Sequence, residues 1–217
     1  MQILFIGGFN NLGDDDYINL DYIADDMLFF YYDRCEKMEA IECRLWKEFN
    51  EGKYDWIIAN SMGAFFCSRL LMKLAHPQNV LFICPYIQTN FYTRFTAGIP
   101  LPYLPNWLLF ANSACRFKFK YIDFILVKVV ETQLLKSVTK HMNTDAYLKI
   151  YKNHNMHIIY GTEDSMAEMT PMTIANLMTT CKVYPIHSKH EPFNDDTVIQ
   201  HNLKRKLLLI LSSNINI

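Results

Sequence analysis

A serine at position 61 follows a short apolar run and precedes a segment with helical spacing, within residues 59–63, ANSMG. Small residues, Ala59 and Gly63, flank it two positions away on either side. A serine on a sharp strand-to-helix turn needs such neighbours, because the chain packs closely against itself there. That turn exposes the hydroxyl and directs the backbone N–H of Met62 toward an oxyanion formed at it. Residues 59–63 by themselves fit a nucleophilic serine and a serine that only caps the helix equally well.

Two later segments carry an acid and a base that suit such a nucleophile. Asp164 and His190 each follow a short apolar run, so both are expected just beyond the carboxyl end of a strand. Open α/β sheets keep their sites at that edge. The chain order serine, aspartate, histidine is also the one expected for a nucleophile on this kind of turn. We therefore predict a triad of Ser61, Asp164 and His190.

Neighbouring residues offer alternatives for two members of this triad. His187 lies closer to the end of its strand than His190 does, and Glu163 directly precedes Asp164. The position of His190 farther into the loop favours it as the base. His187 and Glu163 remain the alternative base and orienting acid.

The first apolar run ends in a pair of glycines, Gly7 and Gly8, followed by Phe9. A Gly-Gly turn lets the backbone approach a ligand closely, and its N–H groups suit the second half of an oxyanion hole. A dinucleotide-binding fingerprint fits less well. The third glycine, Gly13, lies directly before three aspartates, which would repel a pyrophosphate.

Short apolar and aromatic runs recur along the chain and alternate with segments of helical spacing. Nearly continuous apolar runs are typical of strands buried on both faces of a parallel sheet. The expected strands are residues 3–6, 28–32, 56–59, 80–84, 157–160 and 182–186. The expected helices between and after them are residues 37–50, 64–75, 171–178 and 197–211. This alternation predicts an α/β fold with a mostly parallel, doubly wound sheet of about six strands.

Residues 88–153 interrupt the alternation, because they contain no convincing strand. A structureless loop of this length is improbable in a compact domain, so we expect a helical cap inserted into a core of residues 1–87 and 154–217. Aromatic side chains of the first half suit an apolar acyl pocket above the site, or form the cap's own core. The candidates for this pocket are Phe91, Phe95, Trp107 and Phe110 of the insertion, together with Tyr86 just before it.

Composition excludes several classes of protein. The 217 residues are 51% hydrophobic and 20% charged, with a net charge of -1, which argues against a nucleic-acid partner. Six scattered cysteines form no CxxC pair, so neither a zinc site nor a disulfide framework is expected. The N-terminal run is short and lacks a basic start, and no run reaches the roughly 20 apolar residues of a transmembrane span. We expect a cytoplasmic protein with reduced thiols.

These motifs together resemble those of the α/β-hydrolase superfamily over nearly the whole chain, as a small serine esterase- or thioesterase-like member. Residues 59–63 are similar to its Gly-x-Ser-x-Gly nucleophile elbow, with Ala59 in place of the first glycine. Residues 7–9 resemble its oxyanion turn, with Gly7 in place of the usual histidine. Residues 161–164, GTED, and 190–193, HEPF, resemble its acid and histidine loops.

The resemblance implies a role for each site residue. Ser61 is then the nucleophile, His190 the base and Asp164 the orienting acid, with the backbone N–H groups of Phe9 and Met62 as oxyanion donors. The implied activity is hydrolysis of a hydrophobic acyl ester or thioester, free or linked to a carrier or lipid, through an acyl-enzyme and without cofactor or metal. An acyltransferase or lyase on the same scaffold, and a non-catalytic ligand-binding or interaction protein, are the alternatives.

Overall fold

A computed structural model of the chain describes residues 1–9, 26–33, 36–88, 133–164, 167, 169–190, 192–193 and 197–213. Six strands of these residues form one sheet. They are β1 (Gln2–Ile6), β2 (Asp26–Phe30), β3 (Trp56–Asn60), β4 (Asn79–Ile83), β5 (Asn155–Gly161) and β6 (Lys182–Ile186). All six were expected from the apolar runs. β2 begins and ends two residues before the expected 28–32, because Tyr31 and Tyr32 prolong the aromatic run beyond the strand.

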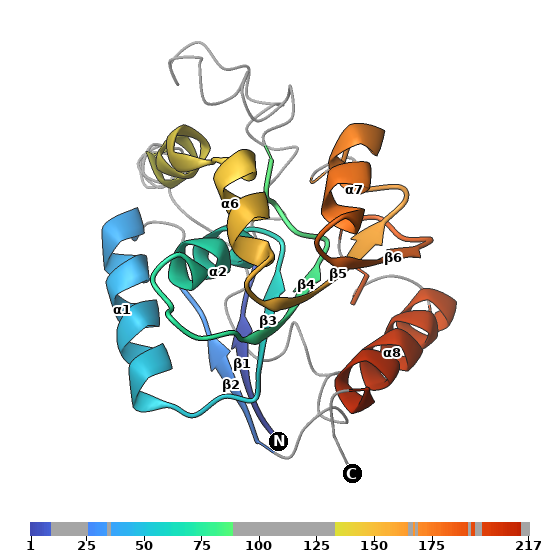
Figure 1. Cartoon of the computed structure of the whole chain (residues 1–217), viewed down its shortest axis with the longest axis horizontal. Coiled ribbons are helices and arrows are strands. Elements are labelled where there is room, and N and C mark those ends of the chain that lie inside the picture. The colour runs from blue at the N-terminus through green and yellow to red at the C-terminus, as the bar shows by residue number, and fades with distance from the viewer. Residues whose placement is uncertain are drawn as a thin grey trace, which may run out of the picture.

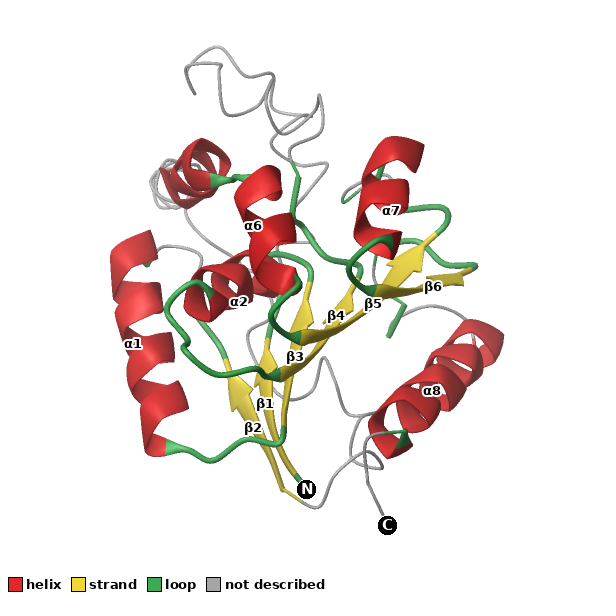
Figure 2. Cartoon of the chain, viewed as in Figure 1, coloured by secondary structure: helices red, strands yellow, loops and turns green. Residues whose placement is uncertain are grey.

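The sheet has the order β2-β1-β3-β4-β5-β6, and every neighbouring pair is parallel. All six arrowheads consequently point to the same edge (Figure 2). The chain reverses its direction of travel across the sheet after β2, when it returns past β1 to β3. Site residues that follow β1, β3, β5 and β6 therefore meet at a single edge. The predicted parallel, doubly wound sheet is confirmed.

Helices cover both faces of this sheet. They are α1 (Met38–Glu51), α2 (Gly63–Leu71), α6 (Thr144–Tyr151), α7 (Pro171–Met178) and α8 (Thr197–Ser212). The first four contribute to one apolar cluster, and α8 packs into a second cluster on the opposite face of the sheet (Figure 1). α2 ends at Leu71, four residues before the expected boundary, although the apolar spacing continues through Met72 and Leu74.

The alternation of side chains along the central strands explains why these runs are almost wholly apolar. In β3, Ile57 and Ala59 belong to the cluster beneath α1 and α2, whereas Trp56 and Ile58 belong to the cluster beneath α8. All five residues of β3 are buried. A strand between two helical layers has no solvent-facing side and so carries no polar alternation.

The predicted cap insertion lies mostly outside the described residues. Its described part is helical, at residues 133–141 and in α6. The Thr144 hydroxyl, at the start of α6, donates to the carbonyl of Ile87 at 2.9 Å and so fastens this helix to the chain that leaves β4. The boundaries of core and cap remain predictions.

Within the described ranges, no helix has the length and apolarity that a bilayer crossing requires. The four cysteines described there, Cys43, Cys67, Cys84 and Cys181, are free thiols.

Candidate active site

Ser61 occupies the turn between β3 and α2 in a left-handed backbone conformation, with φ of 50°. A residue with a Cβ rarely adopts this conformation, and it persists only where surrounding contacts impose it. The Ser61 N–H donates to the carbonyl of Ile83 at 3.0 Å, and its carbonyl accepts the N–H of Tyr86 at 2.9 Å. The end of β4 thus holds the serine backbone from both sides, which leaves the hydroxyl at the edge of the sheet.

The hydroxyl of Ser61 does not serve as the cap of α2. Met62 occupies the N-cap position and makes no side-chain cap hydrogen bond. The Ser61 Oγ instead lies 2.6 Å from Nε2 of His190, a residue 129 positions later in the chain. This geometry therefore does not support the interpretation of Ser61 as a helix cap.

Gly63 lets the elbow lie directly against the end of β1. A Cβ at this position would be 2.4 Å from the carbonyl oxygen of Ile6 and 2.5 Å from that of Gly7. Real Cβ atoms do not approach backbone oxygens this closely. The absence of a side chain brings the elbow and the Gly-Gly turn into contact.

His190 lies between the serine and the aspartate. Its Nδ1 is 2.8 Å from Oδ2 of Asp164, while its Nε2 faces the Ser61 hydroxyl. The His190 side chain is 11% exposed and that of Asp164 is 3% exposed. Because an ionised carboxylate only accepts hydrogen bonds, Nδ1 carries the proton and Nε2 is left as the acceptor for the serine hydroxyl.

The Asp164 carboxylate is fixed from its other side. Its Oδ1 accepts the backbone N–H of Ala167 at 2.8 Å, and the N–H of Asp164 itself donates to the carbonyl of Gly161 at 3.3 Å. Held in this way, the carboxylate can orient the imidazole and stabilise its positive form.

The alternative base and acid lie elsewhere. His187 and Glu163 pair with each other at 3.4 Å, and their side chains are 80% and 51% exposed. The structure therefore brings His190 and Asp164, rather than His187 and Glu163, to Ser61.

The backbone N–H groups of Phe9 and Met62 are the oxyanion donors predicted for the nucleophile, Ser61. Met62 follows it and is buried, while Phe9 is half-buried at the end of the turn against which Gly63 packs. Among the hydrogen bonds of the described residues, none uses the N–H of Phe9 or of Met62. Neither N–H group thus has a hydrogen-bond partner among the described residues, which is one of the conditions that an oxyanion hole must meet.

Of the predicted pocket residues, only Tyr86 is described. It is 7% exposed and its backbone is bonded to that of Ser61, so it borders the nucleophile directly. The others fall on residues that the structure does not describe: Phe91, Phe95, Trp107 and Phe110.

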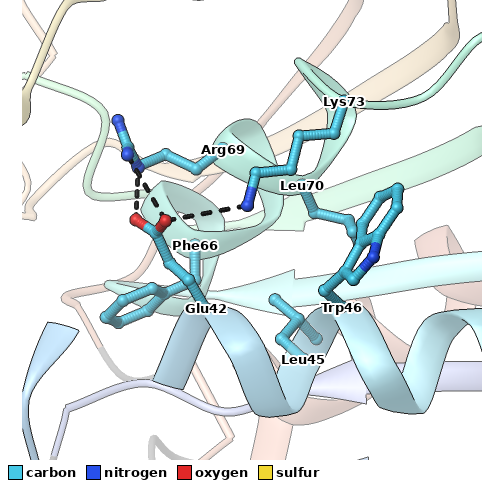
Figure 3. Close-up of a pocket in the computed structure, with 7 residues that line it drawn as sticks. All are labelled: Glu42, Leu45, Trp46, Phe66, Arg69, Leu70 and Lys73. Carbon is cyan, nitrogen blue, oxygen red and sulfur yellow. Dashed lines mark hydrogen bonds and ion pairs between the residues drawn. The ribbon is translucent and has the colours of Figure 1, made fainter. Parts of the chain in front are cut away.

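A shallow depression between α1 and α2 contains none of the predicted site residues (Figure 3). Glu42 lies at its centre, paired with Arg69 and, at 3.9 Å, with Lys73. This ion pair ties the two helices together. Its opposite charges compensate each other within the depression, which gives no reason to assign it a charged ligand. No cluster of His, Cys, Asp or Glu suited to a metal occurs in the described residues.

Three residues that support the site were not predicted from the sequence: Cys84, Ala167 and Ser188. A fourth, Gly161 at the end of β5, was already part of the predicted acid-loop motif. The three unpredicted residues contact the site from distant segments or through a backbone N–H, and the sequence pattern reveals neither kind of contact.

No protein-family model matches the sequence, and no curated protein is significantly similar to it. Solved structures do resemble this one. YbtT, a type II thioesterase from the yersiniabactin NRPS/PKS biosynthetic pathway, has a TM-score of 0.62 at 12% identity, over 97% of this chain and 94% of its own. ClbQ from the colibactin NRPS/PKS pathway has a TM-score of 0.61 at 12% identity, over 98% of both chains. An epoxide hydrolase of the α/β-hydrolase superfamily, from metagenomes of hot environments, has a TM-score of 0.57 at 8% identity, over 97% of this chain and 89% of its own.

These similarities span the sheet and its helices, so the chain has the α/β-hydrolase fold. YbtT is a thioesterase, whereas the metagenomic protein is an epoxide hydrolase. The fold alone consequently does not select a reaction, and the reaction has to be argued from the site.

Proposed function

We propose that this protein is a serine hydrolase that cleaves a carboxylic ester or thioester of a hydrophobic acyl group. The observation that carries the proposal is the continuous chain of hydrogen bonds from Ser61 through His190 to Asp164. Acyl transfer needs a hydroxyl nucleophile, a base that is hydrogen-bonded to this hydroxyl, and a carboxylate that is hydrogen-bonded to the other nitrogen of the base. The site supplies all three, with the hydroxyl on a strained turn.

In the first half of the proposed reaction, Ser61 Oγ attacks the acyl carbonyl while Nε2 of His190 takes its proton. The developing oxyanion accepts hydrogen bonds from the N–H groups of Phe9 and Met62, each worth about 3–4 kcal/mol in enzymes of this kind. Asp164 stabilises the imidazolium. His190 then returns the proton to the leaving alcohol or thiol, and the acyl group remains on Ser61.

In the second half, water enters the site and His190 removes its proton as the water attacks the acyl-enzyme. Collapse of the second tetrahedral intermediate releases the acid and restores the Ser61 hydroxyl. Both halves use the same base and the same donors. The chemistry is complete without metal or cofactor.

The hydrophobic acyl group is proposed from the surroundings of the serine. Phe9, Met62, Tyr86 and Ile87 belong to or pack against one apolar cluster beside it. Apolar surroundings of this kind favour binding of an apolar acyl chain over a charged one.

The structural similarity to YbtT, a type II thioesterase, supports including thioesters among the substrates. The substrate is then a small free ester or thioester, or one whose acyl group is attached to a carrier or lipid through the bond that is cleaved. We place this activity in the cytoplasm, because the free thiols of the described residues suit a reducing compartment.

Turnover of a chain-length series of p-nitrophenyl esters and acyl thioesters tests the proposal. The parent should hydrolyse members of the series, and Ser61→Ala should lower kcat by a factor on the order of 10⁴ or more. A folded parent with no turnover on any of them, or with turnover that survives Ser61→Ala, would contradict it. Transfer of the acyl group to an added alcohol in preference to water would instead identify an acyltransferase.

A further inference from the structure

The carbonyl oxygen of Lys189, the residue directly before His190, accepts hydrogen bonds from two buried side chains. The Ser188 hydroxyl donates to it at 3.1 Å and the Cys84 thiol donates to it at 3.8 Å. Ser188 and Cys84 are each 1% exposed. The peptide unit that leads into His190 is therefore fixed by donors on two different segments, one after β6 and one after β4.

Cys84 also belongs to the structure that holds the nucleophile. It follows Ile83, whose carbonyl accepts the Ser61 N–H, and precedes by two residues Tyr86, whose N–H donates to Ser61. Its own N–H donates to the carbonyl of Ile159 in β5 at 2.8 Å. A shift of Cys84 would thus move the contacts of both the elbow and the histidine loop.

The backbone of Cys84 is left-handed, with φ of 44°, and it shares this feature with Ser61 among the described non-glycine residues. Glycine would adopt this conformation without strain. A side-chain-bearing residue persists in it only where its surroundings impose it, and such residues cluster at functional sites. Cys84 therefore places a thiol at a position whose backbone conformation favours glycine.

The acid loop supports the same peptide from a third side. A Cβ on Gly161 would lie 2.5 Å from the carbonyl oxygen of Ser188 and 2.7 Å from that of Lys189. The N–H of Glu163 donates to the carbonyl of Ser188 at 3.0 Å. The histidine loop thus rests directly on the backbone that leads to Asp164.

From these contacts we propose that Cys84 and Ser188 are positioning residues that fix the backbone of His190, so that its ring spans the distance between Ser61 and Asp164. Cys84 links the elbow to the histidine loop, and Ser188 holds the same carbonyl from within that loop. This role rests on the proposed function, because it is a role in aligning that triad. Neither side chain touches the substrate.

Three variants test the role: Cys84→Ala, Ser188→Ala and the double variant. Cys181→Ala is the matched control, since Cys181 is also a buried thiol but lies before β6, at the opposite end of the strand from the site. The measurements are kcat and KM on a p-nitrophenyl ester, per site titrated with a fluorophosphonate, and the melting temperature. The NMR signal of the His190 Nδ1 proton, identified by its loss in His190→Gln, reports the ring directly.

Each single variant should lower kcat per titrated site by roughly three- to tenfold at unchanged KM, as loss of one weak donor implies. The double variant should lose more than the product of the two, because either donor alone still holds the shared oxygen. The Nδ1 proton signal should broaden in the double variant and stay unchanged in Cys181→Ala.

Parent-like kcat and an unchanged Nδ1 signal in the double variant would overturn the proposal, whatever the melting temperatures. A double variant no slower than the product of the singles would overturn the shared role at the Lys189 carbonyl. A parent that shows the Nδ1 signal but neither labels nor turns over would contradict the proposed function instead. The response of that signal to the variants would then still decide whether Cys84 and Ser188 position the ring.

Discussion

At the scale of single residues, the strained backbone of Ser61 is the feature on which the site depends. A left-handed non-glycine residue costs on the order of 1–3 kcal/mol. The hydrogen bonds that the Ser61 backbone makes, as donor to Ile83 and as acceptor from Tyr86, offset that cost. The strain turns the hydroxyl toward His190 and away from the N-terminus of α2. If Ser61 had an unstrained backbone and capped α2, its hydroxyl would no longer point toward His190.

Gly63→Ala should damage both stability and the elbow. The new methyl group would meet the backbone oxygens of Ile6 and Gly7, which cannot move without distorting β1. We expect a loss of about 2 kcal/mol or more in the free energy of unfolding, as for overpacking in general, together with a smaller fraction of protein that reacts with a fluorophosphonate. Urea denaturation and titration of reactive sites measure the two effects.

Gly52→Ala is the matched control for this substitution. Its methyl group would meet the ring tip of Tyr54, a side chain that can rotate, so a smaller loss of stability and full reactivity are expected. Equal reactivity in Gly63→Ala and Gly52→Ala would show that the close approach of the elbow to β1 is unimportant for the site.

Residue types and their order predicted Ser61, Asp164 and His190 because each follows an apolar run and each has the chemistry of its role. The choice of His190 over His187 rested only on its place in the loop, and it is the structure that pairs His187 with Glu163.

The sequence pattern did not indicate that Cys84 contacts the site. Its contact with Lys189 joins segments 105 residues apart, and a positive φ at a cysteine cannot be read from its neighbours in the sequence.

At the scale of elements, the two helical layers explain why the strands were the most predictable part of the chain. A strand such as β3 is apolar throughout because both faces are covered, and this run is visible in the sequence. Helix ends were less predictable. The apolar spacing after Leu71 continues, and no glycine or proline marks the point at which α2 stops.

The same layering predicts opposite outcomes for two leucines of α8. Leu207 is fully buried against the sheet, whereas Leu209 is 65% exposed. Leu207→Ala should lower the free energy of unfolding by about 2–5 kcal/mol, and Leu209→Ala should change it by less than about 0.5 kcal/mol. Urea denaturation of both variants checks this. Similar small effects in both would mean that α8 does not pack on the sheet as described.

At the scale of the whole molecule, a buried histidine outside the site should make the stability depend on pH. His157 in β5 is 1% exposed and pairs with the Tyr184 hydroxyl at 3.1 Å. Burial, aided by the Lys182 charge, lowers the pKa of His157 from 6.5 to about 4. At pH values between these two pKa values, His157 binds a proton in the unfolded chain but not in the folded chain, so the stability falls as the pH drops.

The size of this effect follows from the two pKa values. A difference of about 2.5 units corresponds to a loss of up to about 3 kcal/mol between pH 7 and pH 4. His157→Gln removes the titrating group, so its stability should decline less over that range. The measurement is the free energy of unfolding at several pH values for both proteins. Parallel curves for parent and variant would exclude His157 as a source of the pH dependence.

The most direct test of the central claim is to map the adduct formed by a fluorophosphonate probe by mass spectrometry. We predict one adduct, on Ser61, in the folded parent. We also predict none in Ser61→Ala and much slower labelling in Asp164→Asn, whose amide favours the wrong tautomer of His190. A folded parent that stays unlabelled, or that carries the adduct on another residue, would contradict the assignment of Ser61 as the nucleophile.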